Sequence, residues 1–189
     1  RAGSGRAPGR WPVSGWAPCR PSRRRGPAEP FTVTSAGGPC GDAAYHVAVT
    51  LAALSTPAVL VERPRLEANI RRMQAAATAA GIALRPHAKT HKSPFVARQQ
   101  VDEGAVGICC AKRGEAGVFA ASGIADIRLP YPLQPVNASR VLALTKATRI
   151  SFIVDDLEVA RGWSEALSAA GAGVDVLVKI DVGFHRCGI

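Results

Sequence analysis

One short segment of the sequence, residues 85–92 (RPHAKTHK), concentrates side chains that can do chemistry: a lysine, two histidines and flanking cations. It follows an apolar run and is expected to end a buried strand, which would leave the Lys89 amine partly desolvated. Burial and the nearby charges of Arg85 and Lys92 both disfavour the charged amine and so lower its pKa. A neutral lysine amine attacks carbonyl groups to form a Schiff base. A phosphate-binding cluster, or a basic cluster that is simply exposed, explains the same residues equally well.

The two histidines of this segment, His87 and His91, are four residues apart, a spacing that suits a metal when both lie on a helix. Here they flank the end of a strand, so they share a side without forming a compact pair. No cysteine or carboxylate nearby completes a ligand set. We therefore expect no metal site within this segment.

A second polar segment, residues 181–188 (DVGFHRCG), is expected at the end of a later strand. A guanidinium at that place, Arg186, could hold a phenolic or carboxylate oxygen through charge-assisted hydrogen bonds. The alternative is structural: a salt bridge from Arg186 to Asp181 or Asp155.

Repeated strand–helix units must position these two segments. Short apolar strands are predicted to end near residues 89, 110, 130, 155 and 181, so successive ends lie 20 to 26 residues apart. The predicted helices span residues 64–80, 94–104, 114–123, 137–147 and 157–171, and a further short strand is predicted at residues 58–61. Three of the helices are expected to have N-caps, at Ser93, Asn137 and Asp156. Trp163 lies at helical spacing and is expected in the core.

Alternation of short apolar strands with helices indicates an α/β fold with a parallel sheet buried on both faces. Five successive units without a glycine-rich phosphate loop favour a partial (β/α)₈ TIM barrel over a doubly wound sheet. The active site of such a barrel lies at the carboxyl ends of its strands, where both polar segments are predicted to be. A complete barrel needs about 250 residues, so we expect a fragment with about five of eight units.

The first 47 residues differ in composition from the rest and are expected to form a disordered extension rich in Arg, Pro and Gly, followed by the barrel at 48–189. Residues 1–45 contain seven Arg and no Lys and carry half of the net charge of +10. A targeting peptide and a nucleic-acid-binding arm compete with an extension that has no function, which we favour. Because the excess charge is concentrated in this segment, no nucleic-acid partner is expected.

Two further features concern the compartment. The sequence has no run of about 18 apolar residues, so no membrane span is expected. Cys109 and Cys110, two of five cysteines, are adjacent in an apolar run, which argues against a disulfide framework. This pattern favours a reducing compartment, and we expect the cytoplasm.

Four motifs in this order resemble a known family. They are residues 56–58 (TPA), 85–92 (RPHAKTHK), 107–116 (GICCAKRGEA) and 181–188 (DVGFHRCG). Together they make residues 56–189 resemble the N-terminal barrel of the alanine-racemase-like, fold-type III pyridoxal-phosphate enzymes, in the branch of D-threonine aldolase and D-serine dehydratase.

The resemblance implies a cofactor and roles for four residues. Lys89 would bind pyridoxal 5'-phosphate covalently, Arg186 would approach the ring oxygen of the cofactor, and His87 and Thr90 would line the pocket around the lysine. Members of this branch act on small D-amino acids that carry a β-hydroxyl group. The resemblance also implies a homodimer, and a divalent metal whose ligands lie in a C-terminal β domain that is expected to be absent from this chain.

Three functions therefore remain open. The first is a lyase, either an aldolase or a dehydratase, that acts on D-β-hydroxy amino acids. The second is a pyridoxal-phosphate-dependent amino-acid racemase, which would need a second base from outside this chain. The third is a protein without catalysis, either a module that binds the cofactor or a truncated pseudo-enzyme. Because a partial barrel leaves open sheet edges, the chain is expected to be prone to aggregation or partly molten.

Overall fold

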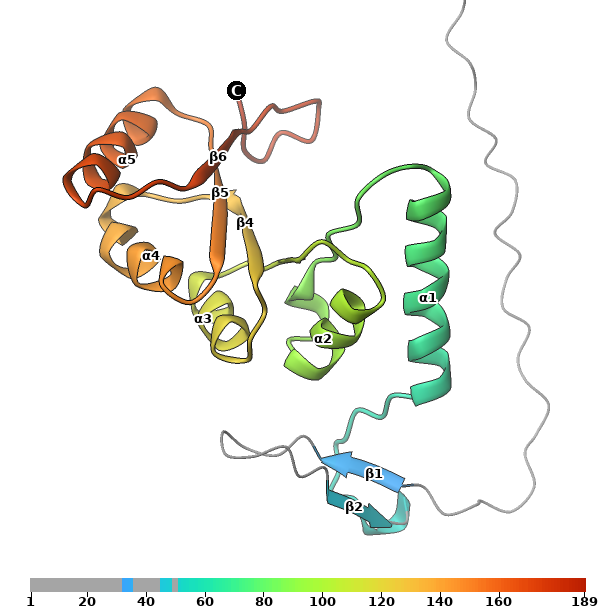
Figure 1. Cartoon of the computed structure of the whole chain (residues 1–189). Helices are drawn as coiled ribbons and strands as arrows, with labels where there is room; N and C mark the ends of the chain where they lie inside the picture. Colours follow the sequence, from blue (N-terminus) through green and yellow to red (C-terminus); the bar gives the residue numbers. More distant parts are fainter. Residues whose placement is uncertain (1–31, 36–44, 49–50) are drawn as a thin grey trace, which may run out of the picture. The chain divides into compact units, whose positions relative to one another are not determined.

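The computed structural model describes residues 32–35, 45–48 and 51–189, in two units that divide between Ala58 and Val59 (Figure 1). The predicted boundary after residue 47 stays a prediction.

The first unit contains a small antiparallel hairpin. Strand β1 (Thr32–Ser35) pairs with β2 (Tyr45–Ala48), with Thr32 opposite Ala48, and a short 3₁₀ turn, η1 (Leu51–Ala53), follows. Both strands are rich in Thr, Val or Tyr, residues that favour extended backbone. Most of the Arg-rich extension lies outside the described residues, so its disorder stays a prediction.

The second unit is built on a parallel sheet with the strand order β3–β4–β5–β6. Its strands are β3 (Ile108–Cys109), β4 (Asp126–Pro132), β5 (Arg149–Val154) and β6 (Asp175–Val178). An extended segment ending at His87 lies beside β3: the Val106 amide donates to the Leu84 carbonyl at 3.0 Å, and His87 pairs with Cys109 in a parallel bridge. Five chain segments therefore run side by side in sequence order, which confirms the predicted α/β fold with a parallel sheet.

Helices connect these strands at the predicted places. They are α1 (Arg63–Ala79), α2 (Pro94–Asp102), α3 (Arg113–Ala121), α4 (Ala138–Thr145) and α5 (Leu157–Ala169). The Ser93 hydroxyl accepts from the Val96 amide at 3.4 Å and the Asp156 carboxylate accepts from the Val159 amide at 2.9 Å, so two of the three predicted caps are confirmed. Asn137 makes no such bond; its side chain instead accepts from Arg113 and donates to the Gln134 carbonyl.

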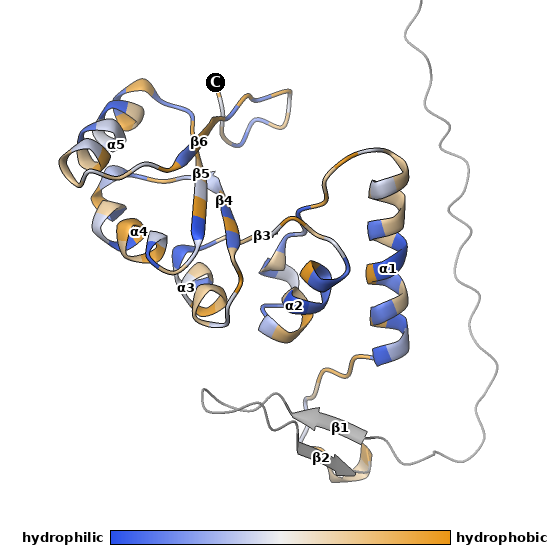
Figure 2. Cartoon of the chain, viewed as in Figure 1, coloured by the Kyte–Doolittle hydropathy of each residue, from blue (hydrophilic) through white to orange (hydrophobic). Residues whose placement is uncertain are grey.

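The core lies between the strands and helices α3, α4 and α5, which Figure 1 shows together beside the sheet. Apolar residues recur along β4, β5 and these helices, as Figure 2 shows by hydropathy. Trp163 is buried in this core, as predicted: its ring lies 4.4 Å from that of Phe152 and its indole N–H donates to the Leu133 carbonyl at 2.6 Å. This packing fixes α5 against β5 and the end of β4.

Two strand predictions were wrong in extent. Residues 58–61 form no strand, and the side chains of Val59, Leu60 and Val61 are exposed, because no described segment pairs with them. β6 ends at Val178 rather than near residue 181, and the residues after it form an irregular loop. In the part of the chain that the structure describes, no helix is both long and apolar enough to cross a membrane.

Candidate functional site

Lys89 lies in a single 3₁₀ turn, η2 (Ala88–Thr90), at the end of the segment that pairs with β3. The backbone amide of Lys89 donates to Nδ1 of His87 at 3.3 Å, and the Thr90 hydroxyl donates to the His87 carbonyl at 3.4 Å. Ala88, between them, is 1% exposed and anchors the turn in the core. The structure therefore brings three of the four predicted site residues together around one turn.

The predicted burial of Lys89 was wrong. Its side chain is exposed, and the two cations expected beside it have partners elsewhere. Arg85 pairs with Asp126 at 2.7 Å, and the Lys92 ammonium lies 3.6 Å from a carboxylate oxygen of Glu115. Lys89 itself makes no ion pair with a described residue, so its amine is accessible to a small carbonyl compound from solution.

The two histidines near Lys89 have different surroundings. Burial, and next the positive charge of Lys89, hold the pKa of His87 below its ordinary value. Burial alone lowers the pKa of His91, whose Nδ1 accepts from the Ser93 amide at 3.0 Å and whose ring meets Phe119 edge-on. Among the described residues, no group of three or more His, Cys, Asp or Glu side chains could hold a metal ion.

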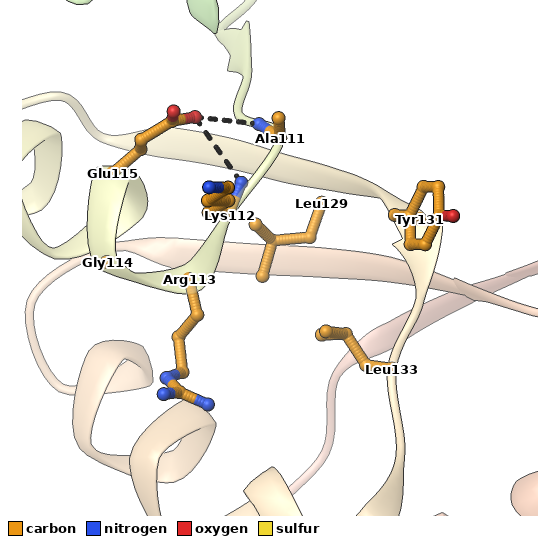
Figure 3. Close-up of a pocket in the computed structure, with 8 residues that line it drawn as sticks. All are labelled: Ala111, Lys112, Arg113, Gly114, Glu115, Leu129, Tyr131 and Leu133. Carbon is orange, nitrogen blue, oxygen red and sulfur yellow. Dashed lines mark hydrogen bonds between the residues drawn. The ribbon is translucent and has the colours of Figure 1, made fainter.

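A hollow of about 410 Å³ opens at the carboxyl ends of β3 and β4 (Figure 3). Its walls are the loop that starts α3 and the end of β4: Ala111, Lys112, Arg113, Gly114, Glu115, Leu129, Tyr131 and Leu133. Glu115 closes the loop, because its carboxylate accepts from the amides of Ala111 (3.0 Å) and Lys112 (3.3 Å). The segment that ends at the lysine turn pairs with β3 through His87 and Cys109, so this turn lies at the same end of the sheet as the hollow, whose walls include no residue of the turn.

Arg186, the fourth predicted residue, reaches the same end of the sheet from the loop after β6. Its guanidinium carbon lies 5.8 Å from the centre of the Tyr131 ring and 5.5 Å from that of Phe184. It forms no salt bridge with either Asp181 or Asp155, the alternative that the sequence left open. These carboxylates accept hydrogen bonds from loop amides, and Oδ2 of Asp181 lies 3.7 Å from Nδ1 of His185. The guanidinium is thus stacked on aromatic faces and not neutralised by a carboxylate of the described chain.

Sequence reasoning did not single out Tyr131. The residue is the last but one of β4, and its position near a strand end was a signal that could have identified it. It joins the hollow to the second predicted segment, since it forms a wall of the hollow and lies under the Arg186 guanidinium.

The fold and this site define a class of protein: a parallel β/α barrel segment with an exposed lysine amine after the segment that pairs with β3, and an arginine after β6 that no described carboxylate neutralises. The chain belongs to the family described as alanine racemase, N-terminal domain, whose model matches residues 61–189.

Individual relatives agree with this assignment. The chain is 43% identical over 140 residues to a D-threonine aldolase of Arthrobacter sp, covering 74% of this chain and 37% of the relative. It is 35% identical over 139 residues to a 3-hydroxy-D-aspartate aldolase of Paracoccus denitrificans, covering 72% and 36%. The crystal structure of a D-threonine aldolase from Filomicrobium marinum superposes with a TM-score of 0.70 at 38% identity, over 74% of this chain and 38% of that one.

Two facts follow from these comparisons. The shared fold confirms the predicted partial barrel. The family match confirms the resemblance to the alanine-racemase-like enzymes. The chain spans a little over a third of the length of these relatives.

Proposed function

We propose that this chain is part of a pyridoxal-phosphate-dependent lyase that acts on small D-amino acids with a β-hydroxyl group, as a D-threonine aldolase or a D-serine dehydratase does. The observation that carries the proposal is the exposed Lys89 amine, unpaired by any described carboxylate, in a turn at the same end of the sheet as the hollow. The 43% identity to a D-threonine aldolase supports it.

The residues present fit the aldehyde and the ring of the cofactor. The amine is accessible, the hollow has apolar walls in Leu129, Tyr131 and Leu133, and Arg186 offers a guanidinium beside it. In this proposal Lys89 holds the cofactor covalently, and Arg186 donates a charge-assisted hydrogen bond to its ring oxygen. When bound, pyridoxal phosphate supplies an electron sink for a carbanion at the substrate Cα.

The chain's own residues prepare this chemistry. The lowered pKa of His87 favours the neutral imidazole near pH 7, so that Nδ1 accepts from the Lys89 amide and fixes the turn. Thr90 closes the same turn through the His87 carbonyl. The apolar side chains of Leu129, Tyr131 and Leu133 would pack against the ring of the cofactor.

A divalent metal that binds the β-hydroxyl oxygen would assist loss of that group or cleavage of the Cα–Cβ bond as a Lewis acid. One solved relative, a D-threo-3-hydroxyaspartate dehydratase, is described in a metal-free form. We propose metal ligands outside the described residues, together with a homodimer in the cytoplasm; Cys109 and Cys110, free in the structure, agree with a reducing compartment.

The test is a trapping experiment on the 189-residue chain. The chain is incubated with one equivalent of pyridoxal phosphate, reduced with borohydride and digested, and the modified peptide is identified by mass spectrometry. We expect the adduct on Lys89, its loss in Lys89→Ala, and no change in the matched control Lys146→Ala at the end of α4. An adduct distributed over other lysines, or none, would refute the proposal.

Two assays separate the reaction types once an adduct is found. Glycine with an aldehyde as products identifies an aldolase, and a keto acid with ammonia identifies a dehydratase. The family model, named for alanine racemase, makes a racemase the second candidate. Formation of the L-enantiomer from a D-amino acid, followed by chiral chromatography, would favour it.

A further inference from the structure

The loop of residues 179–189 carries Arg186 and is closed on itself by its own backbone. The Ile189 amide donates to the Lys179 carbonyl at 3.0 Å, and the Asp181 amide donates to the Ile189 carbonyl at 3.0 Å. Apart from these two bonds, two carboxylates hold the loop, one from within the loop and one from the end of β5.

The first of these carboxylates is Asp181, inside the loop. One of its oxygens accepts from the amides of Gly183 at 2.9 Å and Phe184 at 2.8 Å. Gly183 has φ +111°, which favours glycine, and allows the chain to turn back over the carboxylate. These amide donors keep the pKa of Asp181 below its ordinary value, so the group stays ionised at neutral pH.

The second carboxylate is Asp155, directly after β5. Its Oδ2 accepts from the Gly188 amide at 3.0 Å and so ties the far side of the loop to the neighbouring strand. Only glycine fits at position 188, because a Cβ there would lie 2.6 Å from the Asp181 amide nitrogen and φ is +121°. Arg186 therefore sits between two carboxylate-held points of the loop.

This arrangement decides where the guanidinium goes. Both acids are near Arg186 in the sequence or at the same sheet end, and either one could have neutralised it. Each carboxylate instead accepts a hydrogen bond from a loop amide, and the Arg186 guanidinium lies over the rings of Tyr131 and Phe184.

We propose that Asp155 and Asp181 are positioning residues: they shape the 179–189 loop so that the Arg186 guanidinium is delivered to Tyr131 at the hollow, free of a carboxylate partner. That Arg186 then binds the ring oxygen of pyridoxal phosphate rests on the proposed function. The shape of the loop is independent of that function.

The first test measures the loop in the chain without cofactor. Ring currents of Tyr131 and Phe184 are expected to displace the NMR resonance of the Arg186 Nε–H from the chemical shift of a solvent-exposed arginine. In Asp155→Ala and Asp181→Ala we expect this displacement to be lost. In Asp155→Asn and Asp181→Asn, whose side-chain oxygen still accepts from an amide, we expect it to be largely retained. The control Asp102→Asn, which removes an exposed carboxylate on α2, is expected to change nothing.

The second test is a double-mutant cycle on the dissociation constant of pyridoxal phosphate. We expect Arg186→Gln and each Asp→Ala variant to weaken binding about tenfold, the share of one charge-assisted hydrogen bond. We expect each Asp→Ala change to add nothing in the Arg186→Gln background, because it acts through the arginine.

Three results would overturn the inference. An unchanged Arg186 resonance in both alanine variants would show that the carboxylates do not place the guanidinium. Fully additive losses of cofactor affinity would show that they act on the fold generally. Loss of the displacement in the asparagine variants as complete as in the alanine variants would show that the amide bonds are not the cause. A chain that binds no pyridoxal phosphate refutes the proposed function, while the resonance test still decides the positioning role.

Discussion

Replacement of Gly107 by alanine is expected to be among the most destabilising single changes at the amino end of the sheet. Gly107 immediately precedes β3 with φ +148°, and a Cβ there would lie 2.5 Å from the Asp126 carbonyl oxygen and closer still to Nη1 of Arg85. Real Cβ atoms do not approach backbone oxygen so closely, so Arg85 or β4 must move. Both are held: Arg85 binds Asp126 in two hydrogen bonds, of 2.7 and 3.1 Å.

The expected loss of stability has two contributions. Placing alanine at a positive φ costs about 1 kcal/mol. Displacing the ion pair, whose side chains are only 15% and 19% exposed, costs about 2–3 kcal/mol, the range for hydrogen bonds between charged groups that lose their partner. We therefore expect Gly107→Ala to lower the free energy of unfolding by about 3–4 kcal/mol.

The assay is urea unfolding followed by the fluorescence of Trp163, which is 1% exposed, in a background where Trp11 and Trp16 are replaced by phenylalanine. The matched control is Gly123→Ala: Gly123 also has a positive φ, +83°, but a Cβ there meets nothing within 4 Å. The control is expected to lose about 1 kcal/mol. If Gly107→Ala costs no more than Gly123→Ala, the steric argument is refuted.

Three further predictions concern protonation, reactivity and capping. Because the pKa values of His87 and His91 lie below 6.5 in the folded chain, the unfolded chain binds more protons just below that pH. The histidine contribution to stability should therefore be complete above about pH 6.5 and fall as the pH drops through the pKa values of the folded chain. Urea midpoints measured from pH 5 to 7.5 in the parent chain and in His91→Gln check this. An equal dependence of the midpoint on pH in the variant would contradict it. Burial raises the pKa of the Cys110 thiol to about 12. Iodoacetamide at pH 8 should therefore modify half-buried Cys187 and leave Cys110 unmodified until urea is added, and the masses of the digested peptides measure this. Asp156→Ala removes the N-cap of α5 and should cost about 1 kcal/mol, with Asp156→Ser recovering most of it in thermal melts; a serine variant as unstable as the alanine one would show that the cap is not responsible.

Local patterns predicted most of the helices and the order of the strands. The α5 helix is an example: the Asp156 cap, the apolar spacing and Trp163 are all encoded within a few residues of one another, and the structure agrees with each of them. The motif around Lys89 likewise identified the turn that carries the amine. These features are short-range, because capping and amphipathic periodicity depend on neighbouring residues of the chain.

Strand lengths were predicted less well, and so was residue 137. A strand exists only where another segment pairs with it, so the apolar run at 58–61 forms no strand and is exposed. Asn137 was a good N-cap by type, but Arg113 lies within reach in the fold and takes its side-chain oxygen.

The sequence by itself determined which chemical groups this protein has and at which strand ends they stand: the Lys89 amine, the His87 imidazole and the Arg186 guanidinium. Only the tertiary structure decided which charges neutralise each other. Arg85 lies close to Lys89 in the chain but pairs with Asp126, 41 residues away, and Asp155 binds the Gly188 amide rather than Arg186. An ionised group takes the best-placed partner in three dimensions, and neither spacing nor residue type encodes which partner that is.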